Sequence, residues 1–265
     1  MSIAFLYFFT YPAIMKQYTS SAYKHVKWRS SGGGRVYEML HGRKHFLGRL
    51  YDATFHAPIY GQLKKERRYV QHFLGGNNLT VVDLGGNIGS IQDKKLQILL
   101  QHHKYLRVDI DPEAKPDIVA DAAKLPLKSN SVHFIILKSL LEHVTEPWSV
   151  INEAHRVLKK GGALYFFVPF FNRIHAAPHD YYRFTNEGMR YLLRNFSNVD
   201  VIPVGGFFSS LINQLYLVTY FMDGILLLGM LLRVVFWPFA KLLSELDAFD
   251  RFKLTPTFYY GIAIK

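Results

Sequence analysis

Residues 81–90 read Val-Val-Asp-Leu-Gly-Gly-Asn-Ile-Gly-Ser, a β-branched run that ends in an acid and a glycine-rich turn. Glycines let the backbone approach a ligand, and the helix that follows presents free N–H groups, so this layout is typical of a nucleotide-binding βα turn. An ordinary tight turn in an α/β protein gives the same pattern. Asp109 and Asp111 close the next apolar run and favour the nucleotide-binding turn. Asp109 lies twenty residues beyond Gly89, about where a second strand places a carboxylate under a ribose.

Four further motifs follow this turn in one register. With it, the set is Val-Val-Asp-Leu-Gly-Gly-Asn-Ile-Gly at 81–89, Val-Asp-Ile-Asp-Pro at 108–112, Ala-Asp-Ala-Ala-Lys-Leu-Pro at 120–126, Leu-Leu-Glu-His-Val at 140–144 and Arg-Val-Leu-Lys-Lys-Gly-Gly at 156–162. In order and spacing they resemble class I S-adenosylmethionine-dependent methyltransferases, and most closely the type 11 group often met in bacterial glycan and lipopolysaccharide biosynthesis. The resemblance covers residues 80–196 and the last strand.

Strands and helices alternate regularly from residue 79 onward. We expect strands at 79–84, 105–110, 117–120, 132–138 and 162–169, a sixth near 199–204 and a last one at 257–264. The clearest helix is 147–160, with Thr145 as its cap, Pro147 in its first turn and Gly161 as its stop. The pattern predicts an α/β, Rossmann-like, seven-stranded and mostly parallel sheet with helices on both faces. Strands six and seven are expected to form a hairpin at the sheet edge.

An apolar helical insertion separates the last two strands. Residues 207–240 hold only Asp223 and Arg233 as charges. The segment forms either a helix pair buried in a dimer interface or over the substrate pocket, or a monotopic hairpin that dips into one leaflet. Clean spanning is disfavoured because a mid-membrane acid costs about 2.5–3.5 kcal/mol. Shallow insertion is the favoured reading.

The basic charge of the chain is concentrated at its start. Of the net charge of +12, nine charges lie between residues 1 and 69. Nucleic acid and an anionic membrane surface both fit such an arm, but no nucleic-acid-binding module is present and the membrane is favoured. Residues 3–15 are too short to span a bilayer, which needs roughly 20 apolar residues, and are either packed on the core or an interfacial anchor. Residues 43–68 read as one or two helices, a lid over the cofactor.

These features divide the chain into four parts. They are a basic N-terminal arm or lid at 1–70, a Rossmann-like domain at 71–205, the apolar insertion at 206–250 and a final edge strand at 251–265. No cysteine is present, which excludes disulfides and thiolate metal sites. His41, His45 and His56 lack metal-ligand spacing. We therefore expect no metal site.

The resemblance implies S-adenosylmethionine as cofactor and assigns residues to it. The residues implied to bind it are Asp83, Gly85, Gly86, Asn87, Gly89, Asp109, Ile110, Asp111, Asp121, Ala122 and Lys138. Asp83 is expected to order the turn, Asp109 to hold the ribose hydroxyls with Asp111 as the alternative, and Asp121 to accept from the adenine amine or cap a helix. Asn87 stands where the family usually has glycine. Asparagine tolerates left-handed backbone better than other side chains, so the turn is expected to survive.

Two polar clusters follow the fourth and fifth strands. They are Glu142-His143 and the stretch His-Ala-Ala-Pro-His-Asp-Tyr-Tyr-Arg-Phe-Thr at 175–185, which resembles a motif of the same group. A hydroxyl acceptor must lose a proton, and histidine titrates near neutrality. The candidates for the base are His179, His143 and His175, with His179 first. Asp180 or Tyr182 is expected to hold the acceptor, although Asp180 could also simply pair with Arg183.

Taken together, the sequence predicts a methyltransferase acting at the inner face of the cell membrane on a sugar hydroxyl of a lipid-linked or cell-surface glycan. One alternative is a methyltransferase for a lipophilic acceptor such as a quinone or polyketide. Another is a binding protein that has kept the fold and lost catalysis. Peripheral or monotopic membrane association and a homodimer are the expected assemblies, and no nucleic-acid partner is expected.

Overall fold

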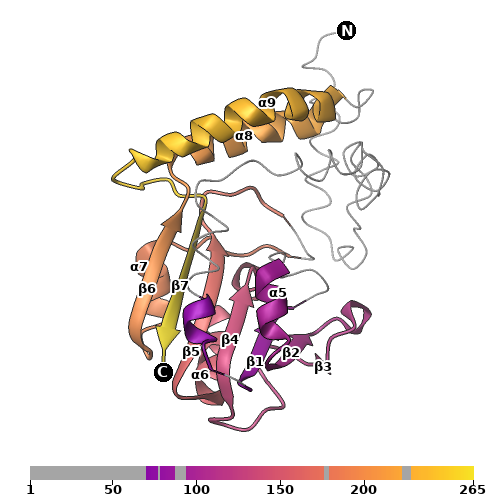
Figure 1. Ribbon diagram of the computed structural model, residues 1–265, viewed down its shortest axis with the longest axis vertical. Helices are drawn as coiled ribbons and strands as arrows, with labels where there is room; N and C mark the ends of the chain where they lie inside the picture. The colour runs from indigo at the N-terminus through magenta and orange to yellow at the C-terminus, as the bar shows by residue number, and fades with distance from the viewer. Residues whose placement is uncertain (1–69, 77, 87–93, 176–178, 223–227) are drawn as a thin grey trace.

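The computed structural model describes residues 70–76, 78–86, 94–175, 179–222 and 228–265. Within them a seven-stranded sheet has the order β3-β2-β1-β4-β5-β7-β6 (Figure 1). β1 to β5 pair in parallel, whereas β7 is antiparallel to both of its neighbours. The strands are β1 (Thr80–Leu84), β2 (Lys104–Asp109), β3 (Ile118–Val119), β4 (Val132–Lys138), β5 (Leu158–Pro169), β6 (Ser197–Val204) and β7 (Phe258–Ile264). This confirms the predicted fold class.

The last strand, however, is not at the edge as predicted. β7 lies between β5 and β6, and β6 forms the edge. Its central residues, 259–263, are all buried, so the strand is covered on both faces as well as paired on both sides. Gly261 makes the close pairing with β6 feasible, since a Cβ there would lie within 1.7 Å of the Asp200 carbonyl oxygen. The expected antiparallel pairing of the sixth and seventh strands is confirmed, but β7 also pairs with β5, so β7 is an interior strand and β6 lies at the edge.

Seven-residue α5 (Lys94–Leu100) and α7 (Asn186–Leu192) flank the sheet together with α6 (Pro147–Val157). α6 buries the predicted apolar face, including Val150 and Ile151. Its start and end differ from the prediction: the cap position is Glu146 without a side-chain cap bond, not Thr145, and the helix ends at Val157. Leu158 already belongs to β5, because its burial in the sheet overrides the helical spacing. The described residues also include the short 3-10 helices η3 (Pro112–Ala114), η4 (Leu141–His143) and η6 (Leu246–Ala248).

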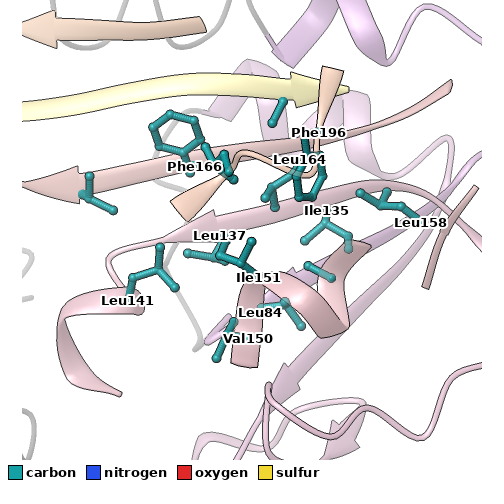
Figure 2. Packing of buried hydrophobic residues seen from close by; sticks show 14 of the residues in the cluster. Leu84, Ile135, Leu137, Leu141, Val150, Ile151, Leu158, Leu164, Phe166 and Phe196 are labelled. Atoms are coloured by element: carbon teal, nitrogen blue, oxygen red, sulfur yellow. The ribbon is translucent and has the colours of Figure 1, made fainter. Parts of the chain in front are cut away.

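The core has two halves because alternate strand residues face opposite sides of the sheet. On one side Ile135, Leu137, Leu164 and Phe166 pack against α6 and α7 (Figure 2). On the other side alternate residues of the same strands pack against α5 and helical residues 70–73; they are Phe134, Ile136, Tyr165 and Phe167. Helices therefore cover both faces, as predicted. The rigid sheet fixes where the strand ends lie, and with them the loops that carry polar residues.

The apolar insertion forms a helical hairpin of α8 (Phe207–Phe221) and α9 (Leu228–Glu245). The two helices lie side by side beyond the carboxyl ends of the parallel strands (Figure 1). Asp247 anchors the hairpin: its buried carboxylate accepts from the backbone N–H groups of Phe208 at 2.9 Å and Ser209 at 3.0 Å, at the start of α8. Neither these helices nor any other in the described parts of the chain has the length and hydropathy needed to cross a membrane.

Several predictions lie outside the described residues. They are the arm or lid at 1–69, the anchor at 3–15, the turn residues Asn87 and Gly89, and Asp223.

Candidate active site

The turn after β1 has the conformation that its glycines predict. Gly85 has φ +73°, and its N–H donates to the Val108 carbonyl of β2 at 2.8 Å. A Cβ on Gly85 would lie 3.1 Å from Leu140, which directly precedes η4. Asp83 is buried, and the hydroxyl of Tyr105 donates to its Oδ2 at 2.6 Å. Nothing in the sequence pattern had singled out Tyr105, which holds the acid below the turn.

The acids after β2 hold one another in place. The N–H of Asp111 donates to Asp109 Oδ1 at 2.9 Å, and that of Glu113 donates to Asp111 Oδ1 at 2.8 Å. Asp111 is therefore engaged as the cap of η3, whereas Asp109 ends β2 itself. Between them Ile110 presents an apolar side chain that is 69% exposed. A carboxylate can accept hydrogen bonds from the hydroxyls of a ribose, and an exposed apolar side chain beside it can contact the base. This pair of residues therefore fits a nucleoside.

The remaining cofactor candidates lie at strand ends on the same side of the sheet. Asp121 is exposed after β3 and accepts from the N–H of Ala123 at 2.8 Å, which closes a turn and not the helix that was expected. Ala122 is half-buried in that turn. Lys138 ends β4, with its Nζ 5.5 Å from the centre of the Phe167 ring. The carboxyl ends of β1 to β4 thus collect every described residue predicted for the cofactor, as open α/β sheets do at their ligand sites.

The two polar clusters of the acceptor side are joined in the structure. The N–H of Tyr181 donates to the Glu142 carbonyl at 2.7 Å, and the Tyr182 hydroxyl donates to the Thr145 carbonyl at 2.8 Å. His143 Nδ1 lies 2.6 Å from the carbonyl oxygen of His179. The rings of His143 and His175 meet edge to face with centroids 5.1 Å apart. The loop after β5 is therefore docked on η4, beside the turn that holds Gly85.

The carboxylate of Asp180 is bound within the protein. Its side chain is 1% exposed and is bound by Arg183 at 2.5 and 2.8 Å and by the N–H of His175 at 2.8 Å. Burial alone would raise the pKa of Asp180, but the hydrogen bonds from Arg183 and from the His175 backbone outweigh it and lower that pKa. The Arg183 pairing considered as the alternative is what the structure shows. The Tyr182 side chain is likewise engaged within the protein, since its hydroxyl donates to the Thr145 carbonyl.

No role was predicted from the sequence for Glu142, which lies at the centre of the acceptor-side cluster. Its side chain is fully buried, and its Oε1 lies 3.7 Å from His175 Nε2 and 3.9 Å from His143 Nε2. The Glu142 carboxylate raises the pKa of His175 above the ordinary 6.5, against the opposing effect of burial. His179, by contrast, is exposed, and its ring lies 5.5 Å from that of Tyr181. A buried acid between two histidines is invisible to spacing, because the histidines come from two separate loops.

The loop after β5 is also tied to the apolar hairpin. Asn213 of α8 donates through its Nδ2 to Asn172 Oδ1 at 3.2 Å. The carbonyl of Asn172 in turn accepts from Arg183 Nε at 3.3 Å. The hairpin and the acceptor-side cluster therefore share one network.

Comparison with known proteins identifies the central part of the chain. Residues 82–166, from β1 into β5, match the family model described as "Methyltransferase domain". Phosphoethanolamine N-methyltransferase 2 of Haemonchus contortus, solved with S-adenosyl-L-methionine, aligns with a TM-score of 0.50 at 13% identity, over 82% of this chain and 56% of that one. Its complex with phosphomonomethylethanolamine and S-adenosylhomocysteine gives 0.49 at 13% identity, over 86% and 60%. A SAM-dependent methyltransferase from Archaeoglobus fulgidus gives 0.48 at 16% identity, over 76% and 92%.

The likeness to these structures concerns the fold. This chain spans only 56–60% of the length of the Haemonchus contortus enzyme. No curated protein matches the sequence. The matched residues contain the glycine turn, Asp109 and the end of β4, which follow or end neighbouring strands at the same edge of the sheet. Residues 82–166 thus match a methyltransferase domain in sequence, and the chain shares its fold with structures solved with S-adenosylmethionine or S-adenosylhomocysteine.

Proposed function

We propose that the protein transfers a methyl group from S-adenosylmethionine to a sugar hydroxyl of a lipid-linked or cell-surface glycan, at the cytoplasmic face of the membrane. One observation carries the proposal of catalysis. The acceptor-side cluster of Glu142, His143 and His175 follows directly after Leu140, and Leu140 packs against Gly85 of the cofactor turn. Clustered titratable groups beside a ligand-binding turn are typical of catalytic centres.

The residues on the cofactor side fit the group they are proposed to hold. Gly85 and Gly86 leave backbone uncovered where a side chain would meet Leu140 or Asp83. Asp109 is proposed to hold the ribose hydroxyls and Ile110 to cover the base, while Asp121 and Ala122 meet the adenine edge. The bound cofactor supplies a methyl group on a sulfonium, which is already a good leaving group. The protein has then chiefly to align the acceptor and remove its proton.

His179 is the proposed base. Its ring is exposed, whereas the Nε2 atoms of His143 and His175 are turned toward Glu142. Its backbone is fixed, since the His179 carbonyl accepts from His143 Nδ1 at 2.6 Å.

The membrane part of the proposal rests on the surface of the hairpin. Two stripes at helical spacing remain exposed: Phe207, Leu211, Leu215 and Val218 on α8, and Leu231, Val235, Phe239 and Leu242 on α9. A helix pair with such stripes suits burial in the interfacial layer of one leaflet, parallel to its plane. The nine excess positive charges of residues 1–69 would add attraction to anionic lipid. The alternative is that the two stripes are buried against a second copy of the chain in a homodimer.

A lipophilic acceptor is the second candidate. Phe171 and Ile174, just before His175, are 43% and 67% exposed and offer apolar contact on the acceptor side. A quinone-like or polyketide-like molecule would use this surface.

One labelling experiment separates these acceptors. The purified protein is incubated with methyl-labelled S-adenosylmethionine and a membrane extract of its source, and the products are partitioned between organic and aqueous phases. Label that is organic-soluble and moves to the aqueous phase after mild acid supports a lipid-linked glycan. Label that stays organic supports the lipophilic acceptor. The same incubation is repeated with soluble and cell-envelope fractions. If protein that binds the cofactor transfers no label to any of the three fractions, the proposal of catalysis is contradicted.

A further inference from the structure

Three acceptor atoms converge between η4 and the loop after β5. Glu142 Oε1, His143 Nε2 and His175 Nε2 all lie within 4.8 Å of one another. Glu142 is fully buried, and neither of its carboxylate oxygens has a hydrogen-bond donor within the described residues. A buried carboxylate that accepts no hydrogen bond has lost its water, so positive charge must lie close by to stabilise it. Something positive is expected between these three side chains.

The histidines are oriented to act as ligands. A carbonyl oxygen can only accept, so His143 Nδ1, 2.6 Å from the His179 carbonyl, carries its hydrogen. His175 Nδ1 lies 3.2 Å from the Arg173 carbonyl and 3.4 Å from Asp180 Oδ2, which places a hydrogen there too. In the neutral rings both Nε2 lone pairs then face Glu142. Histidines that bind metals are held in this way, through the other nitrogen, by a carbonyl or a carboxylate.

The distances are close to those of a metal site. Ligand atoms about 2.1 Å from a tetrahedral ion lie roughly 3.4 Å apart. The two histidine nitrogens lie 3.7 and 3.9 Å from Glu142 Oε1. A few tenths of an ångström of side-chain movement brings these two distances into that range, while the ligand nitrogens of the two histidines lie within 4.8 Å of each other. The His175 side chain is 30% exposed, so an ion can reach it.

We propose that Glu142, His143 and His175 bind one divalent transition-metal ion. Two imidazoles and one carboxylate suit zinc, cobalt, manganese or iron, and they leave positions open for further ligands. This reverses the expectation of no metal site, which considered only local spacing. Resting on the proposed function, an acceptor hydroxyl that occupied an open position would lose its proton more easily. Binding of the ion itself does not depend on that function.

Cobalt titration of the untagged, full-length protein, first stripped with a chelator, tests the site. A four- or five-coordinate Co²⁺ ion with two imidazoles gives visible d–d absorption, and we expect it to saturate at one ion per chain, with Zn²⁺ displacing it. Glu142→Gln and His175→Gln should each weaken binding at least about 100-fold. His102→Ala removes an exposed histidine away from the cluster and should bind as the wild type does.

The alternative to a metal ion is a proton on His175, which the carboxylate of Glu142 would stabilise. No saturable absorption, or equal affinity in the wild type and in whichever of the two variants remains folded by circular dichroism, would overturn the metal site. S-adenosylhomocysteine affinity is measured on the same stripped protein. Loss of metal binding with cofactor binding intact leaves the proposed function standing, so the two failures are distinguishable.

Discussion

Gly86 lies so close to Asp83 that a Cβ on the glycine would be 2.7 Å from the carboxylate oxygen Oδ2. Asp83 has no room to retreat, because it is 1% exposed and Tyr105 donates to that same oxygen at 2.6 Å. The strand that carries the acid and the turn that approaches the cofactor are thus one packed unit. The glycine is needed for its missing side chain.

Gly86→Ala should therefore weaken cofactor binding. The new methyl group must push the turn away from Asp83, and we expect S-adenosylhomocysteine to bind about 5- to 150-fold less tightly, since poorly fitting side chains cost about 1–3 kcal/mol. Isothermal titration calorimetry gives the affinity. Gly75→Ala is the matched control, because its Cβ would meet only the His72 carbonyl at an ordinary 3.6 Å. Equal affinity in both variants would show that the turn does not carry the cofactor.

Most of the fold could be predicted from local pattern. Short apolar runs located all seven strands, because strands that are buried in a sheet need apolar residues. Glycine-rich breaks between these runs mark where the strands end. The position of β7 was missed since nothing in residues 258–264 records that they pair with β5 as well as with β6. The end of α6 was missed since Leu158 continues the helical spacing, and only the sheet decides that it becomes extended.

The cofactor side of the site could be predicted from the sequence, because its residues follow strands directly. The acceptor side could not, because two loops that are distant in the sequence form it together. Gly85 and Asp109 belong to consecutive βα units, whose strand ends a parallel sheet brings together. The pairing of Glu142 with His175 depends on how the loop after β5 folds back, which Arg183 and Asp180 decide through buried bonds. The spacing of residues in the sequence does not predict how this loop folds back. The roles of His179 and of the hairpin surface remain predictions.

The stability of the domain should depend on pH through Glu153. Hydrogen bonds from Arg156 lower the pKa of Glu153 below the ordinary 4.5, against burial, and its Oε1 also accepts from Leu125 N–H at 2.7 Å. A lowered folded-state pKa stabilises the protein above 4.5 and stops doing so as pH falls through the folded value. Glu153→Gln should lower the free energy of unfolding by about 1–2 kcal/mol near neutral pH.

Urea unfolding at several pH values checks this. The difference between wild type and Glu153→Gln should shrink as pH falls well below 4.5. Glu187→Gln, on the exposed first turn of α7, should show little difference at any pH. A gap between wild type and Glu153→Gln that is independent of pH would mean that ionisation of Glu153 does not stabilise the fold.

The exposed stripes of the hairpin should bind anionic vesicles. Val218 and Val235 are 56% and 78% exposed on neighbouring helices, so Val218→Asp with Val235→Asp places charge on the apolar surface without disturbing the core. We expect the double variant to lose at least about 3 kcal/mol of vesicle affinity, more than 100-fold, because burying a charge is costly. Sedimentation with phosphatidylglycerol vesicles measures it. A stable dimer of the wild type, with no vesicle binding and dissociated by the double variant, would favour the dimer interface.

His179→Ala should slow methyl transfer and leave cofactor binding unchanged. Loss of a general base typically costs about 10²–10⁴-fold in rate. The exposed ring can be removed without opening a cavity, and the His179 carbonyl that accepts from His143 is retained. Once an acceptor is identified by labelling, the turnover rate at saturating substrate is the quantity to compare. An unchanged rate would transfer the role of base to His143 or His175.

The central claim is that the carboxyl ends of β1 and β2 bind S-adenosylmethionine, and titration of the purified protein with S-adenosylhomocysteine tests it most directly. Asp109→Asn should bind roughly 10–100-fold less tightly than the wild type, since a hydrogen bond to a charged group contributes about 1.5–3 kcal/mol. Asp111→Asn, which alters only the cap of η3, should bind nearly as the wild type does. Saturable binding at one molecule per chain, lost selectively with Asp109, is the predicted result. Folded protein that binds no S-adenosylhomocysteine, or that binds it equally well without the Asp109 carboxylate, would contradict the account.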